Sequence, residues 1–277
     1  MVAGNGHLEG RVVVITGAAG GFGRLLANGA AARGAKVVVS DVDQGGVDEV
    51  VAALTAEGAE AIGVRTDVTD LAEMKALTSA AAAEFGAVDV MVNNAGTMPL
   101  AFIADHEQAA PAWDRCIDIN IKGVLHGMIA AHDLMIEQGR GHVVNISSIY
   151  GNSATAGAAV YAATKAAVNM MSEAYRIENQ GRIKVTIVRP TGVPATGLGD
   201  TIVNPQGVAG ILGQNMDEYL GVLLGGATAE QQDRDLVEYA ALAPEDLVEQ
   251  ILYAIDQPWG VTISDITVRA TGDRYLI

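Results

Sequence analysis

The chain is poor in cysteine, in aromatic residues and in positive charge. Of its 277 residues one is cysteine, 4% are aromatic, and 17 lysines and arginines stand against 33 acidic residues. Cys116 cannot form an intrachain disulfide, and no CxxC motif or Cys/His cluster is present, so no metal site is expected. This pattern favours a reducing, cytoplasmic compartment, with Cys116 as a buried structural thiol rather than a nucleophile.

The formal net charge of −16 excludes further classes of function. A field of that sign repels nucleic acid and anionic membrane surfaces, so neither is expected as a partner. No apolar run approaches the roughly 20 residues that cross a bilayer. The N-terminal stretch MVAGNGHLEGR lacks the basic and apolar regions of a signal peptide. The sequence therefore predicts a soluble protein.

What the chain does contain is a regular alternation of Val/Ile-rich runs with helical patterns, and half of its residues are hydrophobic. The predicted strands are 11–16, 35–41, 60–68, 88–96, 141–148, 183–190 and 260–270. Apolar strands separated by helices indicate a parallel sheet buried on both faces. Right-handed crossovers then give a doubly wound, Rossmann-like α/β fold of three layers, which we interpret as one domain over residues 1–277.

The regular alternation stops after Pro190. Residues 191–240 are rich in glycine and turn formers, with short apolar pieces such as GVAGILG and YLGVLLGG. A long irregular insertion in a compact domain is usually functional, which favours a substrate lid at about 191–240. A subunit contact or a mobile loop is the alternative interpretation, and a lid can also serve as a contact.

A glycine-rich turn follows the first predicted strand. Residues 16–23 read TGAAGGFG, which places Gly17, Gly21 and Gly23 between a strand and a helix. Glycine allows a tight turn and a close approach of the backbone to a pyrophosphate, and the helix N-terminus offers free N–H groups to the phosphates. The alternative is a turn that serves packing alone.

Asp41 ends the second predicted strand, about 20 residues after the glycine-rich turn. A carboxylate at that place accepts hydrogen bonds from the adenosine ribose hydroxyls and repels a 2′-phosphate. No lysine or arginine lies within 17–23 or just after Asp41 to offset the repulsion. The sequence therefore predicts NAD rather than NADP, although a helix-capping aspartate is compatible with the same position.

Five motifs in order carry a family resemblance: TGAAGGFG, NNAG at 93–96, Asn120 in DINIKG, NISS at 145–148 and YAATK at 161–165. With them the chain resembles the classical short-chain dehydrogenase/reductase (SDR) family over residues 11–190. The resemblance implies an NAD-dependent enzyme in which Asn120, Ser148, Tyr161 and Lys165 form a catalytic tetrad. The cofactor contacts that it implies are Gly17, Gly21, Phe22, Gly23, Asp41, Asp67, Val68, Asn94, Ala95, Gly96, Tyr161 and Lys165. Asn93 is expected to brace neighbouring strands.

One motif departs from the family pattern. After the sixth strand the family has Pro-Gly and then a threonine, whereas this chain reads PTGVPAT at 190–196. Thr191 stands where glycine is expected, but the spacing from Gly192 to Thr196 is the usual one. The implied nicotinamide contacts are Val193 and Thr196, in a register that the departure leaves open.

The pair Tyr161 and Lys165 suits alcohol oxidation, in which a base removes the hydroxyl proton while NAD accepts the hydride. The two residues are four apart and share one face of a helix. An unperturbed tyrosine has a pKa of about 10, and a nearby cation lowers it, so Lys165 is expected to favour the phenolate. Ser148 is expected to hydrogen-bond the substrate oxygen. Asn120 is expected to hold a water that links Lys165 to solvent.

Three segments are expected around the nicotinamide, namely 97–105, 149–160 and 191–233, and none contains lysine or arginine. Phosphates and carboxylates are normally bound by such residues. Met98, Ile149 and Tyr150 indicate an apolar pocket instead. The predicted substrate is a neutral secondary alcohol or ketone with a hydrophobic body.

Rival functions remain open at this point. A 3-oxoacyl reductase or a dihydrodiol dehydrogenase is the alternative within enzymes. A non-catalytic NAD-sensing protein is the alternative in another class, although the complete tetrad argues against it. By resemblance the chain forms a homotetramer through the helices at 111–138 and 159–180.

Overall fold

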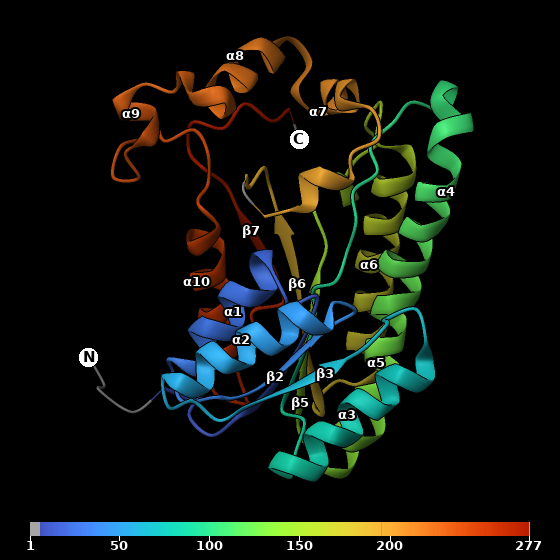
Figure 1. Ribbon diagram of the computed structural model, residues 1–277, viewed down its shortest axis with the longest axis vertical. Helices are drawn as coiled ribbons and strands as arrows, with labels where there is room; N and C mark the ends of the chain where they lie inside the picture. The colour runs from blue at the N-terminus through green and yellow to red at the C-terminus, as the bar shows by residue number, and fades with distance from the viewer. Residues whose placement is uncertain (1–5, 195, 277) are drawn as a thin grey trace.

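A seven-stranded parallel sheet forms the centre of the computed structural model, which describes residues 6–194 and 196–276 (Figure 1). The strands are β1 (Val12–Thr16), β2 (Lys36–Asp41), β3 (Ala61–Arg65), β4 (Val90–Asn93), β5 (Gly141–Ile146), β6 (Ile183–Pro190) and β7 (Asp265–Val268). Their order is β3-β2-β1-β4-β5-β6-β7, and every neighbouring pair is parallel. The order reverses direction between β1 and β4, where ligands bind in doubly wound folds. The predicted Rossmann-like fold is confirmed.

Helices cover both faces of the sheet. One face carries α1 (Gly21–Ala31), α2 (Gln44–Ala56) and α10 (Pro244–Ile255), and the other carries α3 (Leu71–Phe85), α5 (Val124–Glu137) and α6 (Ala159–Glu178). Along β1, Val13 and Ile15 belong to the first apolar core and Val12 and Val14 to the second, as the two-residue period of a strand requires. All four side chains are buried, which explains why the strands read as unbroken Val/Ile runs.

The fourth and fifth helices follow each other without a break, and an irregular helical turn joins them. α4 (His106–Ile117) passes through the π-helical turn η2 (Asp118–Gly123) into α5. A π-helical turn inserts an extra residue into a helix and is frequent at functional sites. The sequence pattern predicted a helix here but not this turn, which contains Asn120.

Several strands are shorter than the Val/Ile pattern predicted. β3 ends at Arg65 rather than 68, and β4 spans Val90–Asn93 rather than 88–96. The residues that follow, 66–68 and 94–96, leave the sheet and line a cavity at its carboxyl edge. The last strand, expected over 260–270, is limited to Asp265–Val268 and pairs only with β6.

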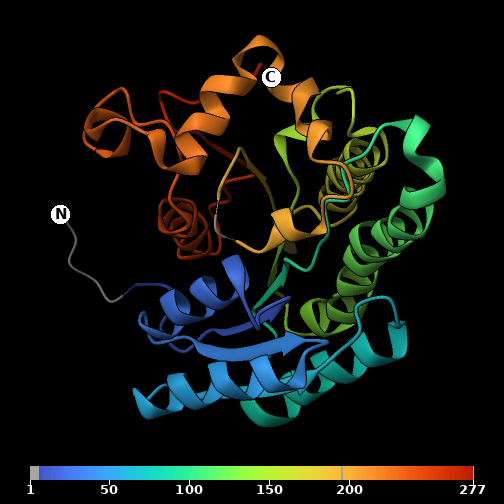
Figure 2. The same cartoon turned by 45° about the horizontal axis from the view of Figure 1, so that its top comes forward.

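The 191–240 segment lies across the carboxyl ends of the strands, as Figures 1 and 2 show in orange. Its short helices are η4 (Leu198–Thr201), η5 (Pro205–Val208), α7 (Ala209–Leu212), η6 (Gly213–Asn215), α8 (Met216–Gly221), η7 (Val222–Gly226) and α9 (Ala229–Gln232). The Met98 N–H donates to Thr201 Oγ1 (2.7 Å) and the Asn204 N–H to the Leu100 carbonyl (2.9 Å). The segment is therefore fastened to the loop that follows β4.

Across residues 6–194 and 196–276, no helix is both long enough and apolar enough to cross a membrane.

Candidate functional site

A cavity of about 880 Å³ opens at the carboxyl edge of the sheet, below the 191–240 segment. The glycine-rich turn, Asp41 and Asp67 line one part of it, and Ser148, Tyr161 and Lys165 line another. Of the residues predicted for the site, only Gly23 and Asn120 do not reach its surface. The fold thus brings together residues that are up to about 180 positions apart in the chain.

The glycine-rich turn depends on its glycines for its backbone angles and its close packing. Gly17 and Gly21 have φ angles of 65° and 50°, which L-residues with a side chain rarely adopt. A Cβ on Gly23 would lie 2.3 Å from the Gly17 carbonyl oxygen, so Gly23 allows α1 to pack against the turn. The N-cap of α1 is Gly20, and no side chain caps the helix. Its first N–H groups are therefore not occupied by a capping side chain, which leaves them available as donors.

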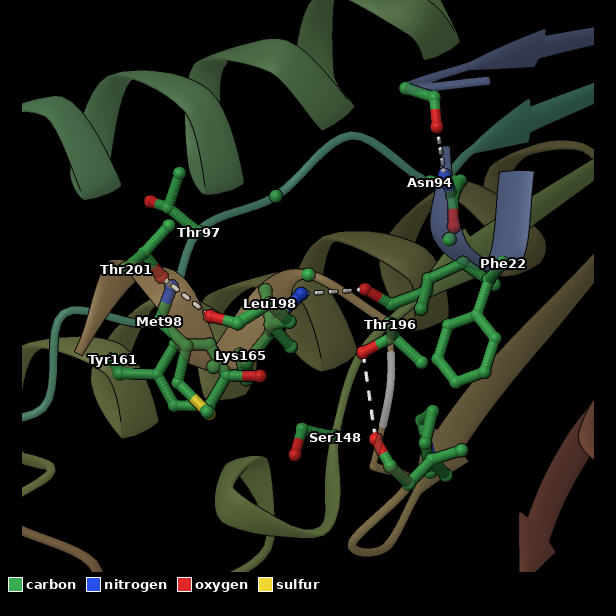
Figure 3. Close-up of a pocket in the computed structure, with 18 of the residues that line it drawn as sticks. Phe22, Asn94, Thr97, Met98, Ser148, Tyr161, Lys165, Thr196, Leu198 and Thr201 are labelled. Atoms are coloured by element: carbon green, nitrogen blue, oxygen red, sulfur yellow. Dashed lines mark hydrogen bonds between the residues drawn. The ribbon is translucent and has the colours of Figure 1, made fainter. Parts of the chain in front are cut away.

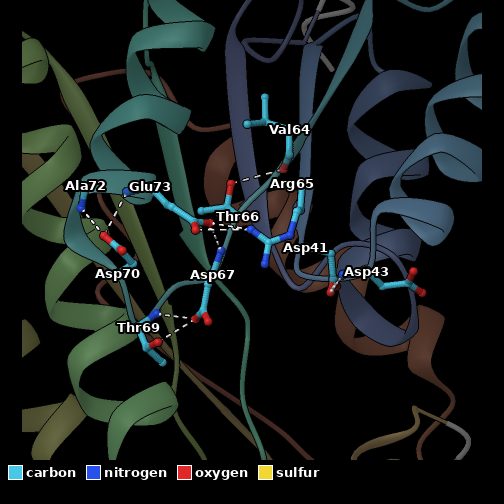
Figure 4. Close-up of polar contacts among 10 residues, drawn as sticks. All are labelled: Asp41, Asp43, Val64, Arg65, Thr66, Asp67, Thr69, Asp70, Ala72 and Glu73. Carbon is cyan, nitrogen blue, oxygen red and sulfur yellow. Dashed lines mark hydrogen bonds and ion pairs between the residues drawn. The ribbon is translucent and has the colours of Figure 1, made fainter.

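Asp41 stands at the end of β2, where the sequence placed it (Figure 4). Its carboxylate accepts hydrogen bonds from the N–H groups of Ala19 (3.2 Å) and Asp43 (3.1 Å). Asp41 is not a helix cap, because Asp43 caps α2 by accepting from the Gly45 N–H. The carboxylate lines the cavity and joins the glycine-rich turn to the next loop.

Arg65 is a cation near Asp41 that sequence reasoning missed. The parallel pairing of β2 with β3 sets Asp41 opposite Arg65 (Figure 4). The Arg65 guanidinium pairs with the Glu73 carboxylate at 3.0 Å, and this pairing offsets its charge. Strand register brings together positions that are 24 residues apart, which inspection of the residues just after Asp41 could not reveal.

Asp67 and Val68 follow β3 and line the cavity beside Asp41. The Asp67 carboxylate accepts from the Thr69 hydroxyl (2.7 Å) and the Thr69 N–H (2.9 Å), and these bonds lower the pKa of Asp67. The charge of Arg115, which also lines the cavity, contributes to the same shift. Asp67 is thus an ionised hydrogen-bond acceptor at this end of the cavity.

The NNAG motif follows β4. Asn93 donates through Nδ2 to Asn145 Oδ1 (2.7 Å) on β5, which agrees with the strand-bracing role expected of it. Asn94 donates to the carbonyls of Thr16 (2.9 Å) and Gly17 (3.0 Å), and so holds the start of the glycine-rich turn. Asn94, Ala95 and Gly96 line the cavity in sequence.

Ser148, Tyr161 and Lys165 line the same cavity, the first after β5 and the other two on α6 (Figure 3). Ser148 follows β5; its hydroxyl accepts from the Tyr150 N–H (3.3 Å) and is close enough to Tyr161 to favour the phenolate. Lys165 lies one turn of α6 after Tyr161, with Nζ 5.7 Å from the centre of the Tyr161 ring. The Lys165 ammonium donates to the Ile146 carbonyl (2.8 Å), while Ser147 donates to the Lys165 carbonyl (3.1 Å). The end of β5 and α6 thereby hold each other in register.

The pKa of Tyr161 moves opposite to the expectation from sequence. Burial raises it above the ordinary value, and the hydrogen bond with Ser148 opposes this only in part. Lys165 is itself buried, which lowers the pKa of its ammonium to about 8, with a smaller opposing effect from Cys116. Desolvation is the largest cause of both shifts, and it favours the neutral phenol of Tyr161.

Asn120 is fully buried behind the cavity wall. Its Nδ2 group donates to the Thr97 carbonyl (2.9 Å) and to Thr164 Oγ1 (3.1 Å), and its Oδ1 accepts from the Thr97 N–H (2.9 Å). The side chain thus fastens the loop after β4 to α6. A Cβ on Gly96 would lie 3.3 Å from Asn120 Oδ1 and 3.7 Å from Lys165 Nζ, so both groups face the same side of Gly96.

The loop after β6 closes the cavity from above. Val193 and Thr196, which the resemblance assigns to the nicotinamide, both line it. The Thr196 carbonyl oxygen would lie 2.5 Å from a Cβ on Gly21, so this loop rests directly on the glycine-rich turn. Figure 3 shows Thr196 beside Phe22, which also lines the cavity.

The remaining part of the cavity is apolar. Met98, Ile149 and Tyr150 line it as predicted, and Cys116 is buried just behind them in the same apolar cluster. The 191–240 segment, whose apolar residues were expected in this pocket, contributes Ile202, Val208, Ile211 and Leu212. Sequence reasoning missed Tyr219 and Tyr275, which complete the wall.

Comparisons with known proteins agree with this geometry. The chain matches the model of the short chain dehydrogenase family over residues 11–206. An uncharacterised oxidoreductase of Staphylococcus aureus is 33% identical over 263 residues, which are 95% of this chain and 98% of the relative.

Two solved structures are similar throughout. A short chain dehydrogenase/reductase from Burkholderia phymatum in complex with NAD is 30% identical, with 94% of this chain and 89% of that chain covered and a TM-score of 0.75. The closed form of a serine dehydrogenase complexed with NADP⁺ is 27% identical, with 93% and 94% covered and a TM-score of 0.76. These neighbours support a nicotinamide cofactor but differ in its type.

Proposed function

The chain belongs to the short-chain dehydrogenase family, and from this premise we propose that it is an NAD-dependent oxidoreductase that interconverts a neutral, hydrophobic secondary alcohol and its ketone. The observation that carries the proposal is the cavity itself. It connects a phosphate-binding turn and Asp41 to Ser148 and Tyr161, and then to an apolar compartment. A dinucleotide fits the first part because glycines leave its backbone accessible and the N-terminus of α1 is uncapped by side chains.

The nicotinamide supplies hydride transfer, and the chain's own side chains handle the proton. In the direction of ketone reduction, Tyr161 donates its phenolic proton to the substrate oxygen while Ser148 hydrogen-bonds the same oxygen. In the direction of oxidation, the Tyr161 phenolate accepts the hydroxyl proton. The Lys165 ammonium favours that phenolate by its charge.

Asn120 has a positioning role: it holds neighbouring residues of the site in place. Its amide fixes Thr97 and Thr164, and its Oδ1 faces the same side of Gly96 as Lys165 Nζ. We place at that side the water that links Lys165 to solvent.

Asp41 supports NAD over NADP. Its carboxylate lies at the sheet edge where the adenosine ribose binds in this fold, and the nearest strand cation, Arg65, is already paired with Glu73. A 2′-phosphate on the cofactor would lie next to the Asp41 carboxylate. Within β3 (residues 61–65) the one cation, Arg65, is engaged by Glu73 and would not offset the repulsion.

The test begins with purified protein, NAD or NADP, and a panel of neutral secondary alcohols and ketones, followed by absorbance of the reduced cofactor. We expect turnover with NAD. Tyr161→Phe should abolish it and leave NAD affinity within about twofold, because the ring stays in place and only the proton carrier is removed. Near-normal turnover by this variant would refute the mechanism, and a strong preference for NADP would refute the role of Asp41.

The proposed assembly is a homotetramer. Apolar side chains remain exposed on the helices that the resemblance assigns to subunit contacts, among them Met170 (74% exposed) and Ile177 (61% exposed) on α6 and Ile129 on α5. Such a face is typical of an interface. Light scattering should give the mass of four chains, and Met170→Glu should lower it; a wild-type mass of one chain would contradict the assembly.

A further inference from the structure

Four of the seven tyrosines of this aromatic-poor chain line the cavity. Tyr161 and Tyr150 pack edge to face with ring centres 5.4 Å apart, and Tyr219 and Tyr275 do the same at 5.3 Å. The proposed reaction uses only the hydroxyl of Tyr161. The second pair therefore carries two hydroxyl groups in the apolar compartment that the chemistry does not require.

The hydroxyls of Tyr219 and Tyr275 form a hydrogen bond with each other, with Tyr275 as the donor. Among the residues that the structure describes, neither hydroxyl has another hydrogen-bond partner. Two phenols carry two protons, and the bond between them uses one. The pair therefore keeps one O–H donor and several lone pairs free. Burial raises the pKa of both phenols, so they are neutral donors.

The C-terminal tail is held in place for this contact. The Leu276 N–H donates to the Ile211 carbonyl (3.0 Å), and Asn215 Nδ2 donates to the Arg274 carbonyl (3.1 Å). The Arg274 guanidinium also pairs with Glu218 at 2.9 Å. In Figure 1 the dark-red segment that follows β7 passes below α8. The hydrogen bonds of the two residues next to it in sequence, Arg274 and Leu276, thus hold Tyr275 in place.

Gly192 locates the hydroxyl pair within the cavity. A Cβ on Gly192 would lie 1.4 Å from Tyr275 Oη and 2.5 Å from Tyr219 Oη, so the pair touches the backbone of the loop after β6. Val193, the next residue, is a proposed nicotinamide contact. The pair therefore lies beside the reacting end of the cavity, and only glycine at position 192 leaves room for it.

We propose that Tyr219 and Tyr275 together recognise a second, neutral hydrogen-bonding group on the substrate, a hydroxyl or a carbonyl, apart from the group that reacts. The inference rests on the proposed function for the reacting group and narrows its substrate class to hydroxyketones, diketones and the related diols. A few polar groups in an otherwise apolar pocket set the orientation of a ligand. The side chains packed around the pair (Leu100, Ile149, Ile211 and Leu212) are buried and apolar, so a neutral group fits better than an anion.

The experiment compares two probe ketones of nearly equal shape. Both are cyclohexanones; one carries a hydroxyl on the ring carbon opposite the carbonyl, and the other carries a methyl group there. Binding to the Tyr161→Phe protein saturated with NADH is measured by titration calorimetry, so that no turnover is needed. We expect the hydroxyl probe to bind about tenfold more tightly, which is the ~1.4 kcal/mol that a single good hydrogen bond supplies.

The decisive variant adds Tyr219→Phe and Tyr275→Phe to the same background, which removes both hydroxyls and keeps both rings. It should bind the two probes within about twofold of each other, with the affinity for the methyl probe unchanged. The matched control is Tyr253→Phe, on the exposed tyrosine of α10, which should keep the tenfold preference. Each single variant then shows which hydroxyl donates to the ligand.

The outcomes separate this inference from the proposed function. A tenfold preference that is lost in the double variant and kept in Tyr253→Phe supports the inference, whether or not the wild-type protein reduces either ketone. Equal binding of the two probes by the parent protein, or a preference that survives loss of both hydroxyls, overturns it. Turnover of the methyl probe with no such preference would leave the proposed oxidoreductase intact and the recognition role of the pair refuted.

Discussion

Replacing Lys165 by methionine should change the pH dependence of folding stability in a predictable way. Burial lowers the pKa of Lys165 from 10.5 to about 8. A pKa difference of about 2.5, at 1.36 kcal/mol per unit, means that burying the charged ammonium costs the folded protein about 3 kcal/mol. Methionine has a similar length and no charge, so Lys165→Met removes this cost. It also leaves the Ile146 carbonyl without its 2.8 Å donor, at about 1–3 kcal/mol.

The cost of burying the ammonium can be told apart from the lost hydrogen bond because that cost depends on pH. Below pH 8 folded and unfolded chains both hold the proton, so the cost of burial is present in full. Between about pH 8 and 10.5 the folded chain has released the proton and the unfolded chain has not. The unfolded state then binds more protons, and wild-type stability rises with pH by this contribution. Lys165→Met lacks this pH-dependent contribution. The difference in the free energy of unfolding, variant minus wild type, should therefore fall by about 2–3 kcal/mol from pH 7 to pH 10.

Urea unfolding followed by circular dichroism, at one protein concentration and several pH values, measures this difference. Lys184, whose pKa burial also lowers to about 8, is present in both proteins and cancels. The control is Lys75→Met, on an exposed lysine of α3, whose difference from wild type should not change with pH. A difference for Lys165→Met that stays flat from neutral to alkaline pH would refute the argument that the ammonium is buried at a cost.

Three further outcomes follow from the same structure. Asp41→Ser should shift the ratio of kcat/KM for NAD to that for NADP toward NADP by about tenfold or more, because the carboxylate no longer repels a 2′-phosphate; an unchanged ratio in initial-rate assays would count against it. Gly127→Ala should lower the free energy of unfolding by about 1–3 kcal/mol, because the new Cβ would lie 1.8 Å from Asn93 Oδ1. The control is Gly260→Ala, which has open space around the new Cβ and should leave the free energy of unfolding unchanged. Because burial raises the pKa of Tyr161 above its ordinary value of 10, kcat/KM for alcohol oxidation should rise with pH between about 6 and 10, whereas that for ketone reduction should stay nearly constant because the phenol keeps its proton; an oxidation profile that is flat over this range would contradict the acid/base role.

The cofactor half of the cavity could be predicted because local patterns determine it. Each strand reads as an apolar run, and the residues after it must emerge at one edge of a parallel sheet. Gly17 and Asp41 therefore had to be near each other once the strands were placed. Tyr161 and Lys165 share a helix face by their spacing alone. Positions set by strand ends and helix turns need no knowledge of distant contacts.

Properties that depend on strand register or burial could not be predicted. Arg65 is beside Asp41 only because β2 and β3 pair in a particular register. The pKa of Tyr161 is raised rather than lowered because the phenol is buried together with its lysine. A sequence shows that two ionisable groups are neighbours, but the sign of a pKa shift depends on how much water both of them lose.

The substrate half of the cavity is determined by contacts between segments with no common pattern. Tyr219 and Tyr275 are 56 positions apart, one on α8 and one in the C-terminal tail, and their hydroxyls meet at Gly192. In the sequence, Gly192 is one residue later than the family pattern expects, which left its role open. The structure gives a reason for a glycine at that position, because any Cβ would displace the two hydroxyls. A change in substrate class should therefore be obtained at positions 192, 219 and 275 together, while the strand ends that hold the cofactor remain as they are.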